Sequence, residues 1–220
     1  MVTDGYLTIA LAKGKLLSST IDLFRKSGWK CEGVIEDDRR LVFIDEEDQV
    51  KFLVTRPTDV PTYVEYGAAD LGVVGKDVLL EQQRDVRELL DLSFGFCRFV
   101  LAAPRSSLQK QEDLNYRKLR VATKYPNVTE AYFRQLGKDV EIIQLHGSIE
   151  LAPIVGLADQ IVDITSTGET LRVNDLVELD EIAPATARLI ANQISLKTKF
   201  ERIDQLVRKL EQALAGEGGK

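Results

Sequence analysis

Residues 50–75, VKFLVTRPTDVPTYVEYGAADLGVVG, contain the pattern that decides the fold. Their first part, Val50–Thr55, is a nearly continuous apolar run of the kind found in strands that are buried on both faces. A helix is predicted to follow, with Thr58 or Asp59 suited to cap its first turn. A second short apolar strand, Leu71–Gly75, comes next. A strand, a helix and another strand at this spacing predict a parallel sheet that helices cover on both faces.

The same alternation extends in both directions from this stretch. Upstream, the alternating residues Leu7, Ile9 and Leu11 predict a strand, and a helix follows it. Near the end of the sequence, apolar residues from Phe200 to Leu214 recur at helical spacing and predict an amphipathic helix. The other predicted elements are strands at 41–44, 119–123, 141–145, 161–164 and 186–193, and helices at 76–82, 128–136 and 148–155.

Two features indicate that the chain forms two lobes. The segment 89–103 is extended but interrupted by Gly95 and Arg98, which suits a chain that crosses from one lobe to another. Each half also carries a Gly-x-Ala-Asp sequence, at Gly67–Asp70 and at Gly156–Asp159, between a predicted helix and a predicted strand. This match is short, so chance recurrence and structural repetition both stay open.

These elements predict an α/β fold of two lobes with the architecture of the periplasmic binding proteins, mostly parallel sheets and helices on both faces. Residues 1–95 together with 180–220 are expected to form the first lobe, and residues 96–179 the second. A ligand cleft is expected between the lobes, because ligands usually sit in such clefts.

The composition is that of an ordinary soluble globular chain, with 44% apolar and 29% charged residues among 220. The 29 basic and 35 acidic residues give a net charge of −6, which disfavours unspecific nucleic-acid binding. The longest apolar runs, such as Phe99–Ala103, are far shorter than the roughly 20 residues of a membrane span. The first residues lack the pattern of a secretory signal, so we expect a cytoplasmic protein. With only Cys31, Cys97 and His146 available, a disulfide and a soft-ligand zinc site are both disfavoured.

The chemistry is concentrated in residues 161–171, IVDITSTGETL. Asp163 places a charge at the end of an apolar strand, where it is costly unless a site uses it. Side-chain hydroxyls, free backbone N–H groups and a helix start together predict a site for a phosphate monoester that needs no lysine. Asp163 would then accept hydrogen bonds from vicinal ribose hydroxyls. The alternative is a simple Ser/Thr-rich turn that caps the helix. The hydroxyls, grouped around Gly168, belong to Thr165, Ser166, Thr167 and Thr170.

One pattern in this region resembles the signature of the ATP phosphoribosyltransferases, the enzymes that open histidine biosynthesis. It reads Glu150-(x5)-Gly156-x-Ala158-(x2)-Ile161-x-Asp163-Ile164-(x2)-Thr167-Gly168-x-Thr170-Leu171. So many specified positions over this span make the signal strong. The chain is similar to the short form of these enzymes, which lacks the C-terminal regulatory domain of the long form. Further family-like segments, in the family order, are AKGKL (12–16), RPTDVP (56–61), ADLGVVGKD (69–77) and ATKYPN (122–127).

The resemblance implies a reaction in which N1 of the adenine of ATP displaces pyrophosphate from C1 of 5-phosphoribosyl 1-pyrophosphate (PRPP). It implies Mg²⁺ as the cofactor, held through the substrate phosphates, so no metal site built from protein residues is expected. A ribosyl transfer with an oxocarbenium-like transition state needs alignment and charge stabilisation more than a strong base. The residues implied for PRPP binding are Glu150, Asp163, Thr165, Ser166, Thr167, Gly168, Glu169 and Thr170.

Two polyanionic substrates need cations, and several basic residues stand where strands end. Lys13 and Lys15 flank Gly14 at the first strand-to-helix turn, and Arg56 ends a buried strand. A basic residue at this end of a strand points toward the ligand crevice of an α/β lobe. We therefore expect Arg56 and Lys13 to be catalytic, with Arg56 on the departing pyrophosphate. A solvated surface residue is the alternative, above all for Lys15. The residues expected to bind ATP or pyrophosphate are Lys13, Gly14, Lys15, Arg40, Arg56, Asp70, Lys124 and Tyr125.

Several site residues also have a simple structural interpretation. Glu150 could stabilise the start of a helix instead of contacting ribose or Mg²⁺, and Asp70 could be a turn residue. Tyr125 could stack on the adenine or pack in the core. His146, the only histidine, is interpreted as a structural residue with satisfied hydrogen bonds rather than as a base.

The resemblance also implies a partner, because short-form enzymes associate with a regulatory subunit similar to histidyl-tRNA synthetase. A hetero-octamer of four catalytic and four regulatory chains, built on dimers of the catalytic chain, is expected. The apolar face of the C-terminal helix suits one of these contacts or simply covers the first lobe. No nucleic-acid or membrane partner is expected. Two other functions stay open: a non-enzymatic two-lobed domain that binds a small molecule, and a phosphoribosyltransferase that acts on a free base.

Overall fold

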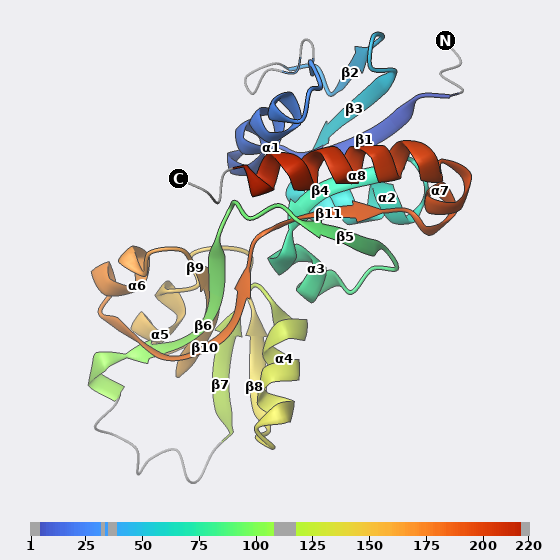
Figure 1. Ribbon diagram of the computed structural model, residues 1–220. Helices are drawn as coiled ribbons and strands as arrows, with labels where there is room; N and C mark the ends of the chain where they lie inside the picture. The colour runs from blue at the N-terminus through green and yellow to red at the C-terminus, as the bar shows by residue number, and fades with distance from the viewer. Residues whose placement is uncertain (1–4, 32–33, 35–38, 108–117, 217–220) are drawn as a thin grey trace. The chain divides into compact units, whose positions relative to one another are not determined.

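The computed structural model describes residues 5–31, 34, 39–107 and 118–216 (Figure 1). The chain divides into two compact units, each with its own sheet and helices, and the predicted α/β class is confirmed. Unit 1 comprises residues 1–79, 83–95 and 186–220, and unit 2 comprises residues 80–82 and 96–185. The chain returns to unit 1 at Thr186 rather than at residue 180, because the last strand of unit 2 continues to Ala185.

Unit 1 is built on a six-stranded sheet in the order β2-β3-β1-β4-β11-β5. Its strands are β1 (Leu7–Ala12), β2 (Val42–Asp45), β3 (Val50–Thr55), β4 (Leu71–Gly75), β5 (Arg87–Asp91) and β11 (Ala187–Ala191). Its helices are α1 (Lys15–Lys26), α2 (Val60–Glu65), α3 (Lys76–Gln82), whose last turn belongs to unit 2, α7 (Gln193–Thr198) and α8 (Phe200–Ala215), with a 3-10 turn η1 (Pro57–Asp59) before α2.

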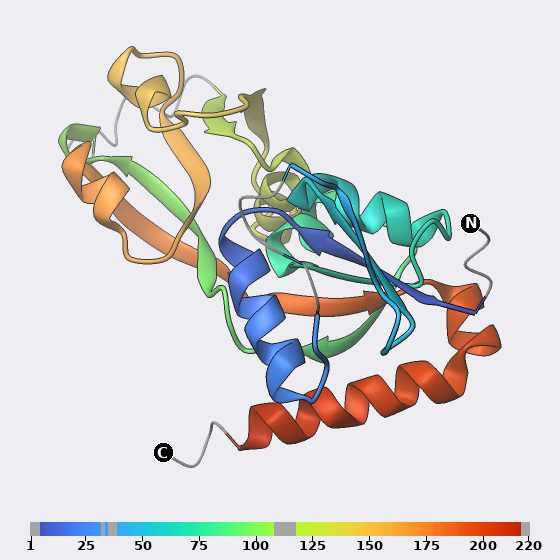
Figure 2. The same cartoon turned by 90° about the horizontal axis from the view of Figure 1, so that it is seen from above.

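Helices cover both faces of this sheet. On one face, α1 and α8 bury Phe24 and Leu206 against strand residues such as Phe52, and Figure 2 shows the two helices on the same side of the sheet. On the other face, α2 and α3 bury Val64 and Val78. The apolar face of the C-terminal helix therefore covers the sheet of its own unit, although Phe200 at the start of α8 is exposed.

Unit 2 repeats this design on a five-stranded sheet in the order β10-β6-β9-β7-β8. Helix α4 packs Phe133 against Phe99 and Val162 on one face, and α5 and α6 pack Ala152 and Leu171 on the other. The strands are β6 (Cys97–Pro104), β7 (Leu119–Thr123), β8 (Val140–Gln144), β9 (Gln160–Thr165) and β10 (Leu176–Ala185). The helices are α4 (Pro126–Gln135), α5 (Leu151–Ile154) and α6 (Glu169–Val173), with a 3-10 turn η2 (Arg105–Ser107).

Both sheets are mixed, so the prediction of mostly parallel sheets is wrong. Among the described strands, four pairings are parallel and five are antiparallel. The parallel pairings join β1, β3 and β4 in unit 1 and β7, β8 and β9 in unit 2. The strand that follows each crossing, β6 or β11, runs against its neighbours on both sides. Strand β10 is missing from the sequence prediction because its charged residues hide the alternation of an edge strand.

The two Gly-x-Ala-Asp sequences are a structural repeat. Their glycines have φ of 72° and 74°. Asp70 accepts a hydrogen bond from the Thr8 N–H at 2.8 Å, and Asp159 accepts one from the Arg120 N–H at 3.0 Å. Each aspartate N–H donates back to the carbonyl of the same partner, at 2.8 and 2.9 Å. Because β3-β1-β4-β11-β5 in unit 1 matches β8-β7-β9-β6-β10 in unit 2, the two units share one topology.

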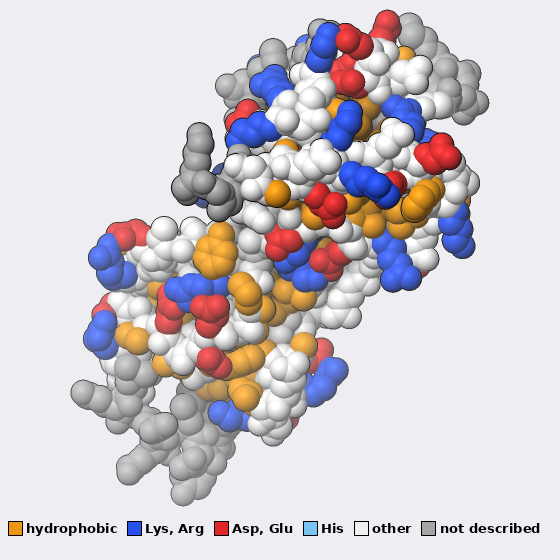
Figure 3. Space-filling view, in the orientation of Figure 1, with side chains coloured by type: hydrophobic (Ala, Val, Ile, Leu, Met, Phe, Trp, Pro, Cys, Tyr) orange, Lys and Arg blue, Asp and Glu red, His pale blue; other side chains and the backbone are white. Residues whose placement is uncertain are grey.

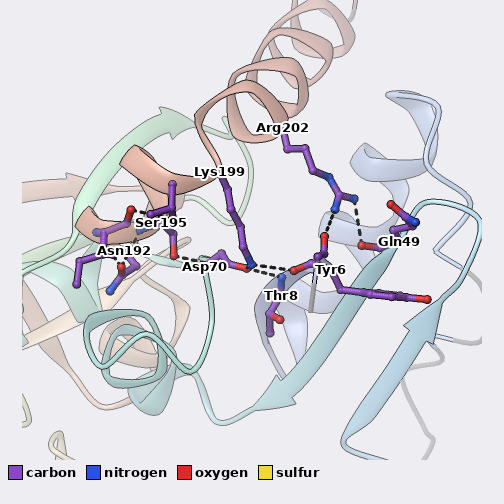
Figure 4. A network of polar contacts seen from close by, with 11 residues as sticks. Tyr6, Thr8, Gln49, Asp70, Asn192, Ser195, Lys199 and Arg202 are labelled. Carbon is purple, nitrogen blue, oxygen red and sulfur yellow. Dashed lines mark hydrogen bonds and ion pairs between the residues drawn. The ribbon is translucent and has the colours of Figure 1, made fainter. Parts of the chain in front are cut away.

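Asp70 also connects the C-terminal helices to the sheet through hydrogen bonds (Figure 4). Besides the Thr8 N–H, its carboxylate accepts hydrogen bonds from Ser195 Oγ and Lys199 Nζ, both at 2.7 Å. One buried carboxylate thus links the amino end of β4 to β1, α7 and the start of α8. Nearby, Arg202 of α8 donates to the backbone carbonyls of Gly5, Asp48 and Gln49.

We expect Asp70→Ala to lower the free energy of unfolding by about 2–3 kcal/mol. The substitution removes the acceptor of the Thr8 N–H and the carboxylate that pairs with the Lys199 ammonium, which keeps the Tyr6 carbonyl. The Asp70 side chain is only 9% exposed, so water replaces these contacts poorly. Urea unfolding followed by Trp29 fluorescence measures this loss in unit 1. Asp204→Ala is the matched control, because Asp204 pairs with Arg208 on the exposed side of α8. A loss in Asp70→Ala no larger than in the control would contradict the assigned role.

Candidate active site

The three parallel strands of unit 2 end at the same edge of the sheet. Thr123 of β7 is in register with Gln144 of β8, and the Leu145 N–H donates to the Thr123 carbonyl at 2.9 Å. Strand β9 pairs with β7 in the same direction and ends at Thr165. Lys124, the turn after β8 and the loop after β9 therefore follow neighbouring strand ends, where α/β sheets bind their ligands.

The loop after β9 presents hydroxyls and amide groups to solvent. Thr165 Oγ1 accepts a hydrogen bond from the Gly168 N–H at 2.8 Å, and Gly168 has a φ of 74°. Within the described chain, the N–H groups of Ser166, Thr167 and Thr170 donate to no other group. Because α6 is only five residues long, its dipole is small, and these amides and hydroxyls supply most of the attraction for an anion.

Asp163 lies two residues before the end of β9. The pKa of its carboxyl group is raised from 3.8 to about 6, mainly by burial and in smaller part by the nearby charge of Glu150. A hydrogen bond from the Ile164 N–H and the charge of Lys124 act in the opposite direction. Glu150 and Lys124 are thus close enough to Asp163 to act on its charge, and Asp163 belongs to the strand that leads into the hydroxyl loop.

The raised pKa of Asp163 makes a testable statement about stability. The folded state binds the proton of the Asp163 carboxyl group more tightly than the unfolded state does. Protonation of Asp163 therefore stabilises the folded state fully below about pH 4, and this stabilisation is lost as the pH rises past 6. We expect Asp163→Asn to be more stable than the wild type at pH 7.5, by up to about 3 kcal/mol, and to gain less at pH 5. Thermal unfolding at the two pH values checks this. An equal gain at both would contradict the ionised, desolvated carboxylate.

In unit 1, cations gather at the corresponding edge. The Lys13 N–H donates to the Thr55 carbonyl at 2.8 Å, so β1 and β3 end together and bring Lys13 beside Arg56. Gly14 has a φ of 94° and no side chain caps the start of α1 there. The side chains of Lys13, Lys15 and Arg56 are exposed, and within the part of the chain that the structure describes none has an acidic partner.

Arg40 and Lys124 are the weaker predicted cations. The Val54 N–H donates to the Leu41 carbonyl, so Arg40 comes before β2 close to the end of β3. Its guanidinium lies 5.1 Å from the centre of the Phe43 ring. Lys124 is exposed at the end of β7, with its ammonium 6.0 Å from the centre of the Tyr125 ring.

The structure contradicts three of the sequence interpretations. Asp70 is at the amino end of β4, opposite Lys13 and Arg56, and its carboxylate is occupied by structural partners, so it does not belong to an ATP site. Tyr125 is 7% exposed and packs its ring edge-on against Phe99 at 4.9 Å, so its ring is core rather than an adenine platform. His146 is exposed, and among the described residues its imidazole has no hydrogen bond, so it is not a satisfied structural residue.

One residue next to the loop was not expected at the site. In the sequence, Arg98 stands out only as a charge within an extended apolar run. In the structure, Arg98 of β6 is in register with Thr165, the last residue of β9. The pairing of β6 with β9 joins two distant segments, and a sequence pattern does not reveal it.

The described residues contain no group of three or more His, Cys, Asp or Glu side chains that could hold a metal ion. None of the helices in the described ranges is both long and apolar enough to span a membrane. The oxygen donors beside the hydroxyl loop, carboxylates and hydroxyls, are of the type that Mg²⁺ accepts, although they do not form a cage.

Comparisons with known proteins agree on one family. A family model described as ATP phosphoribosyltransferase matches residues 56–212. The ATP phosphoribosyltransferase of Citrifermentans bemidjiense is 52% identical over 207 residues, which cover 94% of this chain and 98% of that protein. The enzyme of the same name from Desulfitobacterium hafniense is 53% identical, with 95% of this chain and 96% of that protein covered. A chain of the ATP phosphoribosyl transferase (HisG:HisZ) complex from Thermotoga maritima superposes with a TM-score of 0.80 and 36% identity, covering 96% of this chain and 99% of that one.

Proposed function

The chain belongs to the ATP phosphoribosyltransferase family, and we propose that it catalyses the family's reaction with the residues described above. In this reaction N1 of the adenine of ATP bonds to C1 of PRPP, while the bond from C1 to the pyrophosphate oxygen breaks. The products are N1-(5-phosphoribosyl)-ATP and pyrophosphate, the first step of histidine biosynthesis. The observation that carries the assignment of residues is the hydroxyl loop after β9, with its open amides and the adjacent Asp163.

We assign the phosphoribosyl group of PRPP to unit 2. The hydroxyls and N–H groups of residues 165–170 would hold the 5-phosphate without a lysine. Asp163 and Glu150 would accept hydrogen bonds from the ribose hydroxyls, because Asp163 stands two residues before the loop and the Glu150 carboxylate is close enough to act on it. Lys124, which also faces Asp163, would attract the pyrophosphate end of the substrate.

We assign the cations of unit 1 to the triphosphate of ATP and to pyrophosphate. Lys13, Lys15 and Arg56 are exposed at one sheet edge without acidic partners among the described residues, so a polyanion meets unneutralised charge. The open start of α1 at Gly14 adds free N–H groups. Arg40 comes before β2 on the same side and is a further candidate.

The proposed catalysis is alignment and charge stabilisation. A leaving pyrophosphate gains negative charge as its bond to C1 breaks, and Arg56 would stabilise this charge. The Asp163 and Glu150 carboxylates would hold the sugar so that C1 faces the attacking nitrogen. Mg²⁺, when bound to the pyrophosphate oxygens of PRPP, would neutralise part of the leaving group's charge. We assign it to the substrate rather than to protein ligands.

A separate regulatory chain is the partner that we propose. The structural relative from Thermotoga maritima is described as a HisG:HisZ complex. By analogy, this chain would associate with a subunit similar to histidyl-tRNA synthetase, in a hetero-octamer of four chains of each kind. Cys31 and Cys97 do not form a disulfide with each other, as is usual in a reducing compartment, and the cytoplasm is the location that we propose.

Incubation with ATP, PRPP and Mg²⁺ tests the function directly. We expect phosphoribosyl-ATP and pyrophosphate as products when a regulatory partner is present, and the same assay without the partner measures the activity of this chain alone. Product formation from PRPP and a free base instead of ATP would indicate a free-base phosphoribosyltransferase. Binding of PRPP without any turnover, with the partner present, would indicate a binding domain and contradict the proposal.

Arg56→Ala tests the role assigned to the cation at the end of β3. We expect kcat to fall about 100-fold, because a charge that stabilises the leaving group acts mainly in the transition state. Arg87→Ala is the matched control, because Arg87 is also exposed but lies at the other edge of the sheet. It pairs with Ala191, which in turn pairs with Leu71 at the amino end of β4. Steady-state kinetics compare the two variants. If kcat is unchanged in Arg56→Ala, Arg56 does not act on the pyrophosphate.

A further inference from the structure

Arg98 and Glu178 form a two-pronged ion pair between neighbouring strands of unit 2. Arg98 Nη1 lies 2.6 Å from Glu178 Oε2, and Nη2 lies 2.9 Å from Oε1. The side chains are 21% and 34% exposed, so water screens the pair only in part. Glu181 adds a second, more distant carboxylate at 3.6 Å from Arg98 Nη1. An arginine guanidinium is always charged in proteins, and the hydrogen bonds to Glu178 raise the pKa of the Arg98 guanidinium still further.

This pair stands directly beside the hydroxyl loop. Arg98 is in register with Thr165, where the loop begins. Glu178 Oε1 lies 3.1 Å from the place that a Cβ atom on Gly168 would occupy, so its carboxylate contacts the loop at its glycine. Figure 3 shows acidic and basic side chains close together over β6 and β10. The pair thus bridges the strand residue paired with Thr165, where the turn begins, and the carboxylate that lies against Gly168.

The charges raise an electrostatic problem for a phosphate site. A carboxylate against Gly168 would repel a phosphate dianion bound by the same loop. Arg98 removes this repulsion because its guanidinium binds both oxygens of the carboxylate. If Arg98 were neutral, Glu178 would be left as an uncompensated negative charge at the loop.

We propose that Arg98 and Glu178 are positioning residues of the phosphate-binding loop: Glu178 supports the turn at Gly168, and Arg98 cancels its charge so that the loop accepts a phosphate dianion. This inference rests on the proposed function, because it takes residues 165–170 as the site of the 5-phosphate. It extends that function by adding two residues that do not touch the substrate to the set that determines its affinity.

The test is a double-mutant cycle with Arg98→Gln and Glu178→Gln, measured as the Kd of ribose 5-phosphate by calorimetry. Arg98→Gln should weaken binding about tenfold or more, because it leaves the Glu178 carboxylate unpaired. Glu178→Gln should bind at least as tightly as the wild type. The double variant should return to within about threefold of the wild type, because both charges are then absent.

The direction of rescue separates this role from a merely structural one. Loss of support alone would leave the double variant as weak as Arg98→Gln or weaker, and that result would overturn the proposal. The deficit of Arg98→Gln should also shrink at high salt, because it is a repulsion between charges. Should Arg98→Gln not fold, Glu178→Gln decides: affinity equal to or above the wild type supports the proposal, and a tenfold loss overturns it.

Two controls keep this inference distinct from the proposed function. Arg134→Gln breaks an exposed pair with Glu130 on α4 and should leave the affinity for ribose 5-phosphate unchanged. If the wild type bound no ribose 5-phosphate and formed no phosphoribosyl-ATP, the proposed function itself would fail. If the wild type is active and Arg98→Gln binds ribose 5-phosphate as tightly as the wild type does, only the inference about Arg98 and Glu178 fails.

Discussion

Parallel strands that lie side by side end at the same edge of a sheet, and the candidate site depends on this constraint. In unit 1 it brings Lys13 next to Arg56, and the hydrogen bond from the Lys13 N–H to the Thr55 carbonyl keeps the two strand ends level. In unit 2 it brings Lys124 near Asp163. Residues distant in the sequence meet there without any contact between their side chains having to drive the fold.

The opposite edges of the two sheets, where the parallel strands begin, contribute to stability rather than to the candidate site. Asp70 and Asp159 stand at the amino ends of β4 and β9, and each accepts hydrogen bonds from the neighbouring parallel strand. Both aspartates also pair with a basic side chain, Lys199 for Asp70 and Arg120 for Asp159. These two aspartates at the amino edges are therefore satisfied within the protein, whereas several charges at the carboxyl edges are exposed or desolvated. This division is what a stable scaffold with a reactive edge requires.

Asp163 shows that a charged group at the carboxyl edge of the sheet lowers the stability of the folded protein. Its carboxyl group is half-buried and near the charge of Glu150, and the pKa is raised because ionisation is unfavourable there. A stability-driven sequence would place a neutral residue at this position. Arg98 and Glu178 solve a related difficulty in another way, since their charges cancel each other next to a loop suited to an anion. Both arrangements become understandable once a sugar phosphate is considered at this edge.

The amino-acid sequence by itself determined most of the secondary structure, the two-part organisation, the hydroxyl loop and the cations at strand ends, although it did not reveal β10. These features are local: apolar periodicity, turn residues and a strand followed by a loop occur within a few residues of one another. Only the tertiary structure decided which strands pair. It made the sheets mixed, moved Asp70 and Tyr125 out of the site, and joined Arg98 to a glutamate 80 residues away. Such partners depend on the order of strands in a sheet, and that order follows from how the whole chain packs rather than from any one segment.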